Sequence, residues 1–362
     1  MEDLQMSENI IINSKVRQYQ AVFSNDIIVH LTEQVRPGDY IIIDKNVADL
    51  YPEIIKILFG NSVYIQDSTE LSKSYEEIAQ LLEQIVEVGF RRDNKIIAIG
   101  GGIVQDVASF ISFILYRGVD WVFYPTNLLS QCDSCIGSKI SINLGQYKNL
   151  LGGFYPPSMV LINVHFLSTL KHQDILSGLG EMLHYFLVSS EEDLNSFFKY
   201  VPGVKNNLEQ IELLIKRSLE IKKNMVELDE FDEGPRHIFN YGHSFGHALE
   251  SATDYLIPHG IAVSYGIDLA NLVSVHLGFL SMAERNRIRT ACEMVFGEVC
   301  LPTLDKVRYR AALMRDKKNI GSNLGLILSK GIGEMFKHTC SYEEISEVVE
   351  QFYENKIYLR NI

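Results

Sequence analysis

Short apolar runs alternate with helical patterns along the first third of the chain, and this alternation limits the possible fold more than any other feature. Four apolar runs bounded by polar or turn residues have the pattern of buried strands, at residues 39–44, 62–65, 95–99 and 121–125. Residues 75–88 and the segment after Gly102 instead place apolar side chains at helical spacing. Parallel strands need a crossover connection, which is usually a helix. We therefore predict a parallel, Rossmann-like α/β domain in the N-terminal half.

The pattern changes after about residue 175. Helical periodicity runs through residues 178–189, 208–228, 239–253, 260–277 and 283–295, and β-branched runs become scarce. A chain of 362 residues is long enough for about two domains. We predict a nucleotide-binding α/β domain over residues 1–175 and a mostly α-helical, metal-binding domain over residues 176–362.

The second half contains a histidine pattern suited to a metal. His243 and His247 are four residues apart, so a helix would place both imidazoles on one face. His259 follows after a turn that contains Pro258, and the carboxylate of Glu181 lies upstream. Two or three imidazoles with one carboxylate suit a catalytic Zn²⁺ that keeps one position open for substrate. A single histidine on a helix is usually a surface or core residue, so the whole set is needed to favour a metal.

A glycine turn follows the strand predicted at residues 95–99. Gly100, Gly101 and Gly102 lead directly into a helical pattern. Backbone N–H groups in such a turn, with the helix N-terminus behind them, can hold a phosphate. The turn lacks the GxGxxG spacing of the dinucleotide fingerprint, so a tight turn explains it equally well. Asp106 in the first helical turn either stabilises the helix dipole or contacts a ligand.

Polar and charged residues are concentrated between residues 117 and 149. They are Arg117, Asp133, Lys139, Asn143, Lys148 and Asn149. These positions follow predicted strands, and α/β sheets bind ligands at the carboxyl ends of their strands. Solvated loops would have a similar composition. If they form a site, the cations favour a substrate that carries phosphate or carboxylate.

Composition excludes several classes of protein. The net charge of −13 disfavours a nucleic-acid binder, and no apolar run is long enough to span a bilayer. The acidic N-terminus lacks the apolar core of a signal peptide, so we expect a cytoplasmic protein without a membrane partner. Cys132 and Cys135 form a CxxC pair without a second pair at zinc spacing, and we interpret both as small packing residues.

Together these motifs resemble the 3-dehydroquinate synthase family of sugar phosphate cyclases, from Asp44 to about Leu328. The resemblance rests on five segments in the family's order: Gly100–Gly102 with Asp106 and Arg117-Gly118, PTNLLSQCDS at 125–134, Lys139 with Asn143 and Lys148-Asn149, NYGHSFGHALE at 240–250, and His259-Gly260.

The resemblance implies roles for the matching positions. Zn²⁺ or Co²⁺ would be bound by Glu181, His243 and His259. NAD would be held by Asp44, Asn46, Glu70, Lys73, Gly101, Gly102, Asp106, Thr126, Lys139, Lys148 and Thr169. The catalytic and substrate-contacting set would be Asp133, Lys139, Asn149, His184, Lys222, Arg236, Asn240, His247 and Lys318 or its neighbour Lys317. Arg117 would reach a substrate phosphate across the interface of a homodimer.

The resemblance also implies a reaction and a pathway. The substrate, an anionic sugar phosphate, would be 3-deoxy-D-arabino-heptulosonate 7-phosphate, and the products would be 3-dehydroquinate and phosphate. NAD-recycled oxidation, phosphate elimination, reduction and aldol closure would make the enzyme a carbon–oxygen lyase of the shikimate pathway, which supplies aromatic amino acid biosynthesis.

Several positions depart from the family pattern and leave alternatives open. Asn127, Ser138, Ile140 and His184 stand where the family has Thr, Gly, Thr and Lys, and Asp232 is shorter than the family's acid four residues before Arg236. One alternative is a paralogous cyclase of secondary metabolism, of the 2-deoxy-scyllo-inosose or 2-epi-5-epi-valiolone synthase type. Another is a metal-dependent NAD alcohol dehydrogenase. Arg236 favours a carboxylate substrate instead, because a guanidinium can bind a carboxylate with two hydrogen bonds.

Overall fold

The computed structural model describes residues 9–354 except 146, 205, 206, 298, 300, 303, 317, 320 and 322. The chain divides into two compact units. Unit 1 is Met1–Leu170 with Lys222–Phe231, and unit 2 is Lys171–Ile221 with Asp232–Ile362. The short segment Lys222–Phe231 therefore belongs to unit 1 although both of its flanks belong to unit 2.

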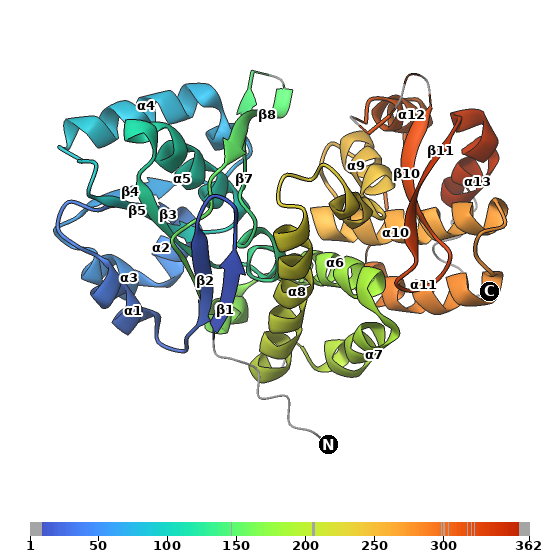
Figure 1. Ribbon diagram of the computed structural model, residues 1–362, viewed down its shortest axis with the longest axis horizontal. Helices are drawn as coiled ribbons and strands as arrows, with labels where there is room; N and C mark the ends of the chain where they lie inside the picture. Colours follow the sequence, from blue (N-terminus) through green and yellow to red (C-terminus); the bar gives the residue numbers. More distant parts are fainter. Residues whose placement is uncertain are drawn as a thin grey trace. The chain divides into compact units, whose positions relative to one another are not determined.

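Unit 1 is built on a seven-stranded sheet with the order β1-β2-β9-β6-β5-β3-β4 (Figure 1). The strands are β1 Asn9–Asn13, β2 Gln18–Phe23, β3 Tyr40–Asp44, β4 Ser62–Gln66, β5 Lys95–Gly100, β6 Asp120–Pro125 and β9 Met159–Ile162. Strands β1 and β2 pair antiparallel, and all other neighbours are parallel. The four strands predicted from the apolar runs are β3 to β6.

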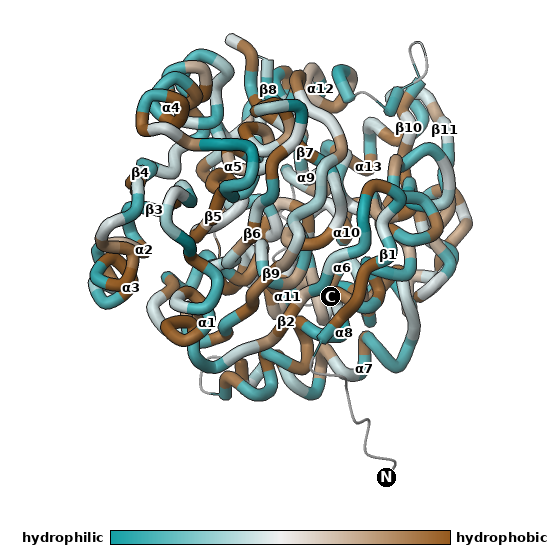
Figure 2. The backbone as a smooth tube through the Cα atoms, turned by 60° about the vertical axis from the view of Figure 1, so that its left-hand side comes forward, coloured by the Kyte–Doolittle hydropathy of each residue, from teal (hydrophilic) through white to brown (hydrophobic). Residues whose placement is uncertain are grey.

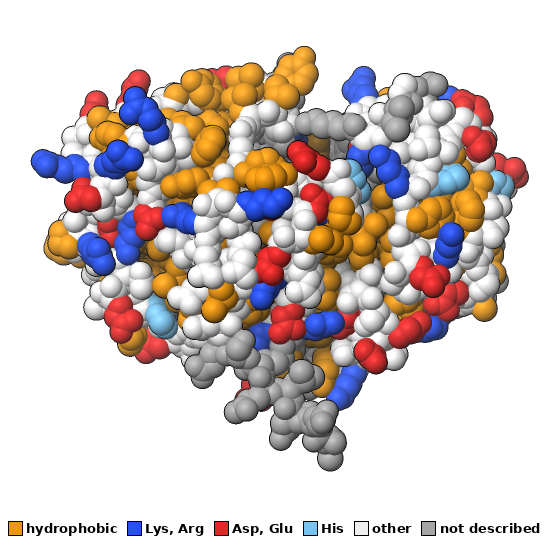
Figure 3. Space-filling model, in the orientation of Figure 1, with side chains coloured by type: hydrophobic (Ala, Val, Ile, Leu, Met, Phe, Trp, Pro, Cys, Tyr) orange, Lys and Arg blue, Asp and Glu red, His pale blue; other side chains and the backbone are white. Residues whose placement is uncertain are grey.

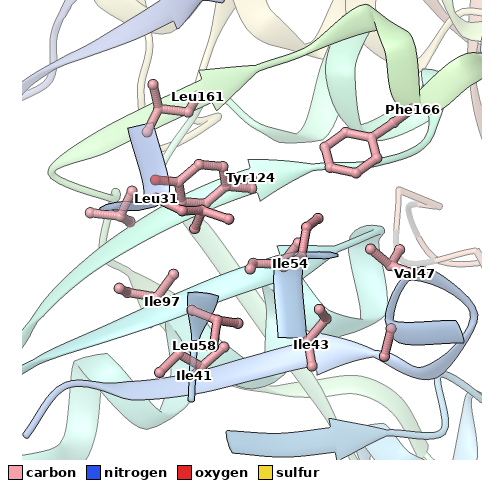
Figure 4. Packing of buried hydrophobic residues seen from close by; sticks show 13 residues of the cluster. Leu31, Ile41, Ile43, Val47, Ile54, Leu58, Ile97, Tyr124, Leu161 and Phe166 are labelled. Carbon is pink, nitrogen blue, oxygen red and sulfur yellow. The ribbon is translucent and has the colours of Figure 1, made fainter. Parts of the chain in front are cut away.

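The central strands β3 and β5 are buried along almost their whole length, as both faces of the sheet are covered (Figure 2). Side chains two residues apart share a face, so Ile41 and Ile43 pack beside Ile97 and Ile99 in one core cluster. Figure 4 shows this cluster, to which helices α1 (Ile27–Gln34), α2 (Lys45–Leu50) and α3 (Pro52–Ile57) add Leu31, Val47 and Ile54.

The remaining elements of unit 1 are helices, short turns and a hairpin. They are α4 (Tyr75–Glu87), α5 (Gly102–Ile114), the single turns η1 (Leu71–Lys73), η2 (Leu115–Arg117), η3 (Ser130–Ser134) and η4 (Val164–Thr169), and the antiparallel pair β7 (Lys139–Leu144) and β8 (Tyr147–Phe154). After β4 the chain crosses to the other side of β3 to form β5. Ligands bind at such a switch point, outside the carboxyl ends of the strands.

Unit 2 is mostly helical, so the predicted fold class is confirmed. Its elements are α6 (His172–Ser189), α7 (Glu191–Tyr200), η5 (Val201–Gly203), the first part of α8 (Leu208–Leu228), η6 (Pro235–Asn240), α9 (His243–Ala252), α10 (His259–His276), α11 (Met282–Phe296), α12 (Lys306–Met314), α13 (Tyr342–Glu354) and the hairpin of β10 (Leu324–Ser329) and β11 (Met335–Cys340). Helix α10 is buried on nearly every side, and α6, α9, α11 and α13 pack around it.

Helices α6 and α10 touch through their backbones at two glycines. A Cβ atom at Gly180 would lie 2.0 Å from the carbonyl oxygen of Gly260, and one at Gly260 would lie 1.8 Å from that of Ser177. Real Cβ atoms do not approach oxygen this closely, so both positions require glycine. The residues next to these glycines are Glu181 and His259, and the contact therefore determines how near their side chains can come.

We predict that Gly180→Ala pushes the two helices apart. The overpacking should cost about 1–3 kcal/mol of unfolding free energy. Zn²⁺ should then raise the melting temperature less than in the parent chain, because Glu181 and His259 separate. Thermal unfolding with and without Zn²⁺ measures both effects. Gly331→Ala is the control, since a Cβ there meets only Glu334 at an ordinary 3.6 Å; an equal loss of the Zn²⁺ response in both variants would contradict the prediction.

Candidate active site

Three side chains from different helices of unit 2 converge on one point. Glu181 lies within α6, while His243 and His259 are the first residues of α9 and α10. The Nε2 atoms of His243 and His259 lie 3.5 and 3.7 Å from the two carboxylate oxygens of Glu181. Ligand atoms around a tetrahedral ion with bonds of about 2.1 Å are about 3.4 Å apart. The three groups could therefore hold a metal ion with little rearrangement.

The second ring nitrogen of each histidine has its own partner. Nδ1 of His243 lies 3.1 Å from the carbonyl oxygen of Tyr241, and Nδ1 of His259 lies 3.3 Å from both carboxylate oxygens of Glu250. A proton on Nδ1 that is donated to these oxygens leaves the Nε2 lone pair available for a metal. Such outer partners are typical of metal-binding histidines, whose orientation and basicity they set.

Glu181 has the negative charge and the unused hydrogen-bonding capacity expected of a metal ligand. Its side chain is almost completely buried. Burial by itself raises the pKa of the Glu181 carboxyl, but the imidazoles of His243, His184 and His259 outweigh it and hold the pKa well below its usual range. Within the described part of the chain, Oε2 has no hydrogen-bond partner. A buried anionic oxygen beside two imidazole nitrogens fits a divalent cation.

His247 and His184 both lie near these three residues, but they differ in solvent exposure. The His247 side chain is exposed, and its ring centroid lies 5.5 Å from those of His243 and His259. His184 is fully buried, with Nδ1 3.7 Å from Glu181 Oε1 and its ring edge-to-face with His243. Phe239 and Tyr185 also pack against the His184 ring. His184 thus supports the ligand set from within the protein.

A polar group in unit 2 contains the residues predicted to bind a carboxylate. Arg236 and Asn240 lie in the same short helix, η6, and Arg236 is buried. The Lys318 ammonium donates a hydrogen bond of 3.3 Å to Asn240 Oδ1 and pairs with Asp316 at 3.1 Å. The structure therefore brings Asn240 and Lys318 together. Lys317, the alternative to Lys318, lies outside the described residues.

The predicted nucleotide-binding residues of unit 1 line up at the carboxyl ends of three adjacent strands. Asp44 ends β3, Gly101 follows β5 and Thr126 follows β6, with the Thr126 N–H donating to Gly100 O at 3.0 Å. An Asp44 oxygen accepts from the backbone N–H groups of Asn46 and Val47 at 2.7 and 3.2 Å, which caps α2. These strand ends flank the switch point of the sheet, where α/β proteins bind ligands.

The space around the glycine turn is shaped by Asn127. A Cβ atom at Gly101 would lie 2.3 Å from Asn127 Nδ2, whereas one at Gly102 would meet nothing within 4 Å. Asn127 Oδ1 also accepts a hydrogen bond of 2.8 Å from the Ser130 N–H. A larger residue at position 101 would displace the Asn127 amide, and the open backbone at Gly102 begins α5, where a phosphate could approach.

Two further interactions organise the nucleotide set, one within it and one that connects it to the β7–β8 hairpin. Lys73, which is buried, forms an ion pair with Asp106 at 2.7 Å. Asn143 on β7 donates to the Glu70 carboxylate at 2.8 Å. Asn143 Oδ1 in turn accepts from the Asn149 N–H at 2.9 Å, which stabilises the positive φ of 51° at Asn149.

Asp133 and Lys222 form a second ion pair in unit 1, in which Lys222 is buried. Lys222 Nζ lies 2.7 Å from Asp133 Oδ1 and donates a 2.7 Å hydrogen bond to the Asp133 carbonyl oxygen. Asp133 lies in η3, a single π-helical turn, and such turns are frequent at functional sites. Lys222 is the first residue of the segment that returns to unit 1.

The other predicted residues lie at the surface. The side chains of Asn46, Lys139, Lys148, Thr169 and Arg117 are exposed. The Thr169 hydroxyl lies 3.0 Å from the Tyr51 hydroxyl, and Arg117 has a positive φ of 66°. The assigned roles of all these residues remain predictions.

Sequence reasoning assigned no role to two residues that organise the site, although it named Asn143 among the polar candidates. Glu250 orients His259, and Asn143 connects Glu70 to Asn149. Both lie inside the motifs that carry the family resemblance, and this position was the signal in the sequence that could have pointed to them. Their partners could not be identified from spacing, because Asn143 and Glu70 are 73 residues apart.

The cysteines that the structure describes are packed in the interior. Cys132, Cys135, Cys292 and Cys340, the four in the described ranges, are all free and buried. Burial raises the pKa of the Cys135 thiol to about 12, so it is protonated at neutral pH. This agrees with the interpretation of the CxxC pair as packing residues. Among the described helices, none has both the length and the apolar character needed to cross a membrane.

Comparison with known families and curated proteins gives one consistent match. The family model for the N-terminal domain of 3-dehydroquinate synthase matches residues 63–177. The family model for its C-terminal domain matches residues 178–319. The chain is 34% identical to the 3-dehydroquinate synthase of a Thermoanaerobacter species over 360 residues. That alignment covers 94% of this chain and 99% of the relative.

Two solved structures share the fold over nearly the whole chain. A 2-deoxy-scyllo-inosose synthase in complex with carbaglucose-6-phosphate, NAD⁺ and Co²⁺ superposes with a TM-score of 0.84 at 24% identity, covering 95% of this chain and 99% of that one. The 2-epi-5-epi-valiolone synthase of Streptomyces hygroscopicus subsp. jinggangensis, with NAD⁺ and Zn²⁺ bound, gives a TM-score of 0.81 at 25% identity, covering 93% and 97%.

We predict that His243→Ala abolishes tight Zn²⁺ binding, because it removes one of three ligands. Glu250→Gln, which weakens only an outer partner, should lower the affinity about 10- to 100-fold. Metal content after dialysis and a Zn²⁺ titration measure both. His276→Ala is the control, since His276 is also on α10 but contacts the Glu344 carbonyl. Retention of full Zn²⁺ affinity by His243→Ala would exclude this metal site.

Proposed function

Because the chain belongs to the 3-dehydroquinate synthase family, we propose that it converts 3-deoxy-D-arabino-heptulosonate 7-phosphate to 3-dehydroquinate and phosphate. The convergence of Glu181, His243 and His259 carries the proposal, because a carboxylate and two imidazoles with an open position suit a catalytic divalent ion. The similarity to a curated 3-dehydroquinate synthase along nearly the whole chain gives independent support. The enzyme would thus be a carbon–oxygen lyase of the shikimate pathway.

The proposed cofactors are NAD and Zn²⁺ or Co²⁺, as found together in the two structural neighbours. When bound, NAD accepts and returns a hydride, and the divalent ion polarises the oxygen that is oxidised. Glu181, His243 and His259 would hold the ion. The strand-end residues Asp44 and Thr126 would hold NAD, with the glycine turn at Gly101 and Gly102 facing its phosphates. Asn46, Glu70, Lys73, Asp106, Lys139, Lys148 and Thr169 complete the proposed set.

The substrate carboxylate is assigned to Arg236 and Asn240. Arg236 is buried, so a carboxylate bound to it forms charge-assisted hydrogen bonds with little competition from water. Lys318 already donates to Asn240 and adds a second cation to this group. These cations do not favour the dehydrogenase alternative, because a simple alcohol carries no charge for them to bind.

The remaining polar side chains are assigned to the sugar hydroxyls and the leaving phosphate. Asp133, Lys139, Asn149, Lys222 and His247 would contact substrate directly. The Asp133–Lys222 ion pair sets the position of both partners before substrate binds. His184 is fully buried against Glu181 and His243, and we assign it to the support of these ligands.

We further propose a cytoplasmic homodimer in which Arg117 reaches the substrate phosphate of the other protomer. Arg117 is exposed and lies beside an apolar surface formed by Phe113, Ile114 and Tyr116, whose side chains are 36–41% exposed. Figure 3 shows hydrophobic side chains gathered over the part of unit 1 that Figure 1 labels α5 and β8. An exposed apolar surface beside a cation suits a protein interface.

Product analysis tests the function. Purified chain with the heptulosonate phosphate, Zn²⁺ and catalytic NAD⁺ should release one phosphate per 3-dehydroquinate, without net NADH. Phosphate assay, mass spectrometry and NADH absorbance give the three readouts. Turnover only of sedoheptulose 7-phosphate or glucose 6-phosphate would instead place the chain with the cyclases of secondary metabolism. Net NADH from a simple alcohol would identify a dehydrogenase.

We predict that Arg236→Ala lowers kcat/KM for the heptulosonate phosphate by about 10- to 150-fold, the effect of losing about 1.5–3 kcal/mol of charge-assisted hydrogen bonding. Arg236→Lys should recover only part of the loss, since an ammonium cannot bind a carboxylate in a planar fork. Steady-state kinetics measure both. Arg308→Ala, which removes an exposed arginine paired with Asp254, is the control. An unchanged kcat/KM in Arg236→Ala would mean that Arg236 does not bind the carboxylate.

A further inference from the structure

A buried carboxylate outside the predicted site connects three segments of unit 1. Glu230, which is 1% exposed, follows the C-terminus of α8. Its Oε1 accepts hydrogen bonds from the hydroxyls of Ser14 and Ser138, both at 2.6 Å, and its Oε2 accepts from the Lys15 N–H at 2.6 Å. Three short hydrogen bonds to one buried carboxylate form a rigid, charge-assisted connection.

One of these donors directly precedes Lys139. Ser138 is itself 1% exposed, and its carbonyl oxygen accepts a 2.7 Å hydrogen bond from the Tyr155 N–H. The preceding Gly137 donates its N–H to the Tyr19 hydroxyl at 2.8 Å. Lys139 then begins β7, opposite Phe154 of β8. The loop before Lys139 is therefore held by hydrogen bonds to the side chains of Tyr19 and Glu230 and to the backbone of Tyr155; among these, the bond to Glu230 comes from the side chain of the residue next to Lys139.

The same short segment holds a second proposed substrate contact. Residues 222–231 begin with Lys222, paired with Asp133, and end with Phe231, whose ring packs edge-to-face on Phe154 at 4.9 Å. Glu227 adds a hydrogen bond of 2.8 Å from the Asn13 N–H. The segment thus fixes Lys222 at one end and the start of β7 at the other.

Ser138 stands where the family pattern has glycine, and a glycine has no hydroxyl to donate. The long side chain of Lys139 is exposed, and the space that its ammonium can reach depends on the position of the backbone from which the side chain starts. A shift of that backbone by about 1 Å is enough to reduce catalysis strongly.

We propose that Glu230 is a positioning residue that, through Ser138, holds Lys139 in register with Lys222 and Asp133 for substrate binding. The proposal rests on the function assigned above, which makes Lys139 a substrate contact. It adds a role for Glu230 and explains the serine at position 138.

Kinetics of Ser138→Ala test the proposal. It should lower kcat/KM for the heptulosonate phosphate about tenfold. Ser14→Ala is the matched control, because it removes a hydroxyl from the same carboxylate oxygen but lies far along the chain from Lys139. Ser14→Ala should lower the melting temperature about as much as Ser138→Ala does. Its kcat/KM should stay within about twofold of the parent value, since Ser138 still holds the backbone next to Lys139.

A double-variant cycle shows whether Ser138 acts through Lys139. In a Lys139→Ala background, Ser138→Ala should add almost no further loss, because the group that it positions is gone. Glu230→Gln should match Ser138→Ala; if this variant does not fold, the Ser138–Lys139 cycle decides alone. A full additive loss in the Lys139→Ala background, or equal kinetics of Ser138→Ala and the parent, would overturn the proposal.

Hydrogen exchange separates this proposal from the function itself. In the absence of substrate, Ser138→Ala should speed amide exchange at residues 137–140, whereas Ser14→Ala should speed it only around residues 14–16. If the parent chain does not turn over the heptulosonate phosphate, the function fails while the exchange pattern still tests the positioning. Unchanged exchange at 137–140 in Ser138→Ala would overturn the positioning role directly.

Discussion

The contact between the α6 and α10 backbones is the constraint on which the metal-binding site depends. Gly180 and Gly260 allow each helix to approach a carbonyl oxygen of the other. The same approach brings Glu181, next to the first glycine, within 3.7 Å of His259, next to the second. A larger side chain at either glycine would separate a carboxylate and an imidazole that we propose share one ion. Packing and chemistry therefore impose the same requirement on these two positions.

In unit 1, the pairing of parallel strands brings the polar residues together. The parallel ladders of β3, β5 and β6 bring three strand ends to one edge of the sheet, so the backbone pairing alone places Asp44, Gly101 and Thr126 on adjacent strands. The apolar runs predicted these strands because a buried parallel strand is hydrophobic on both faces. Their order could not be predicted, since the chain carries no local signal for the crossover that puts β5 beside β3.

Three of the departures from the family pattern make contacts inside the protein. Asn127 packs against Gly101 and caps the following turn. Ser138 donates to Glu230, and His184 is buried beside Glu181. From the sequence alone, these residues suggested a different substrate, because a replaced side chain in a binding motif suggests a different contact with the substrate. Their contacts within the protein instead associate them with the support of the loops and proposed ligands around them.

The sequence by itself determined the class of the fold, the position of most helices and strands, and the residue types available for a metal. These follow from periodicity and from spacing within a helix or a turn, which act over a few residues. Only the tertiary structure decided which of these residues meet. Ser138 and Glu230 are 92 residues apart, and Asn143 and Glu70 are 73 apart. Residues 222–231 belong to unit 1 for the same reason: a hydrogen bond depends on distance in space, which only the packed chain defines.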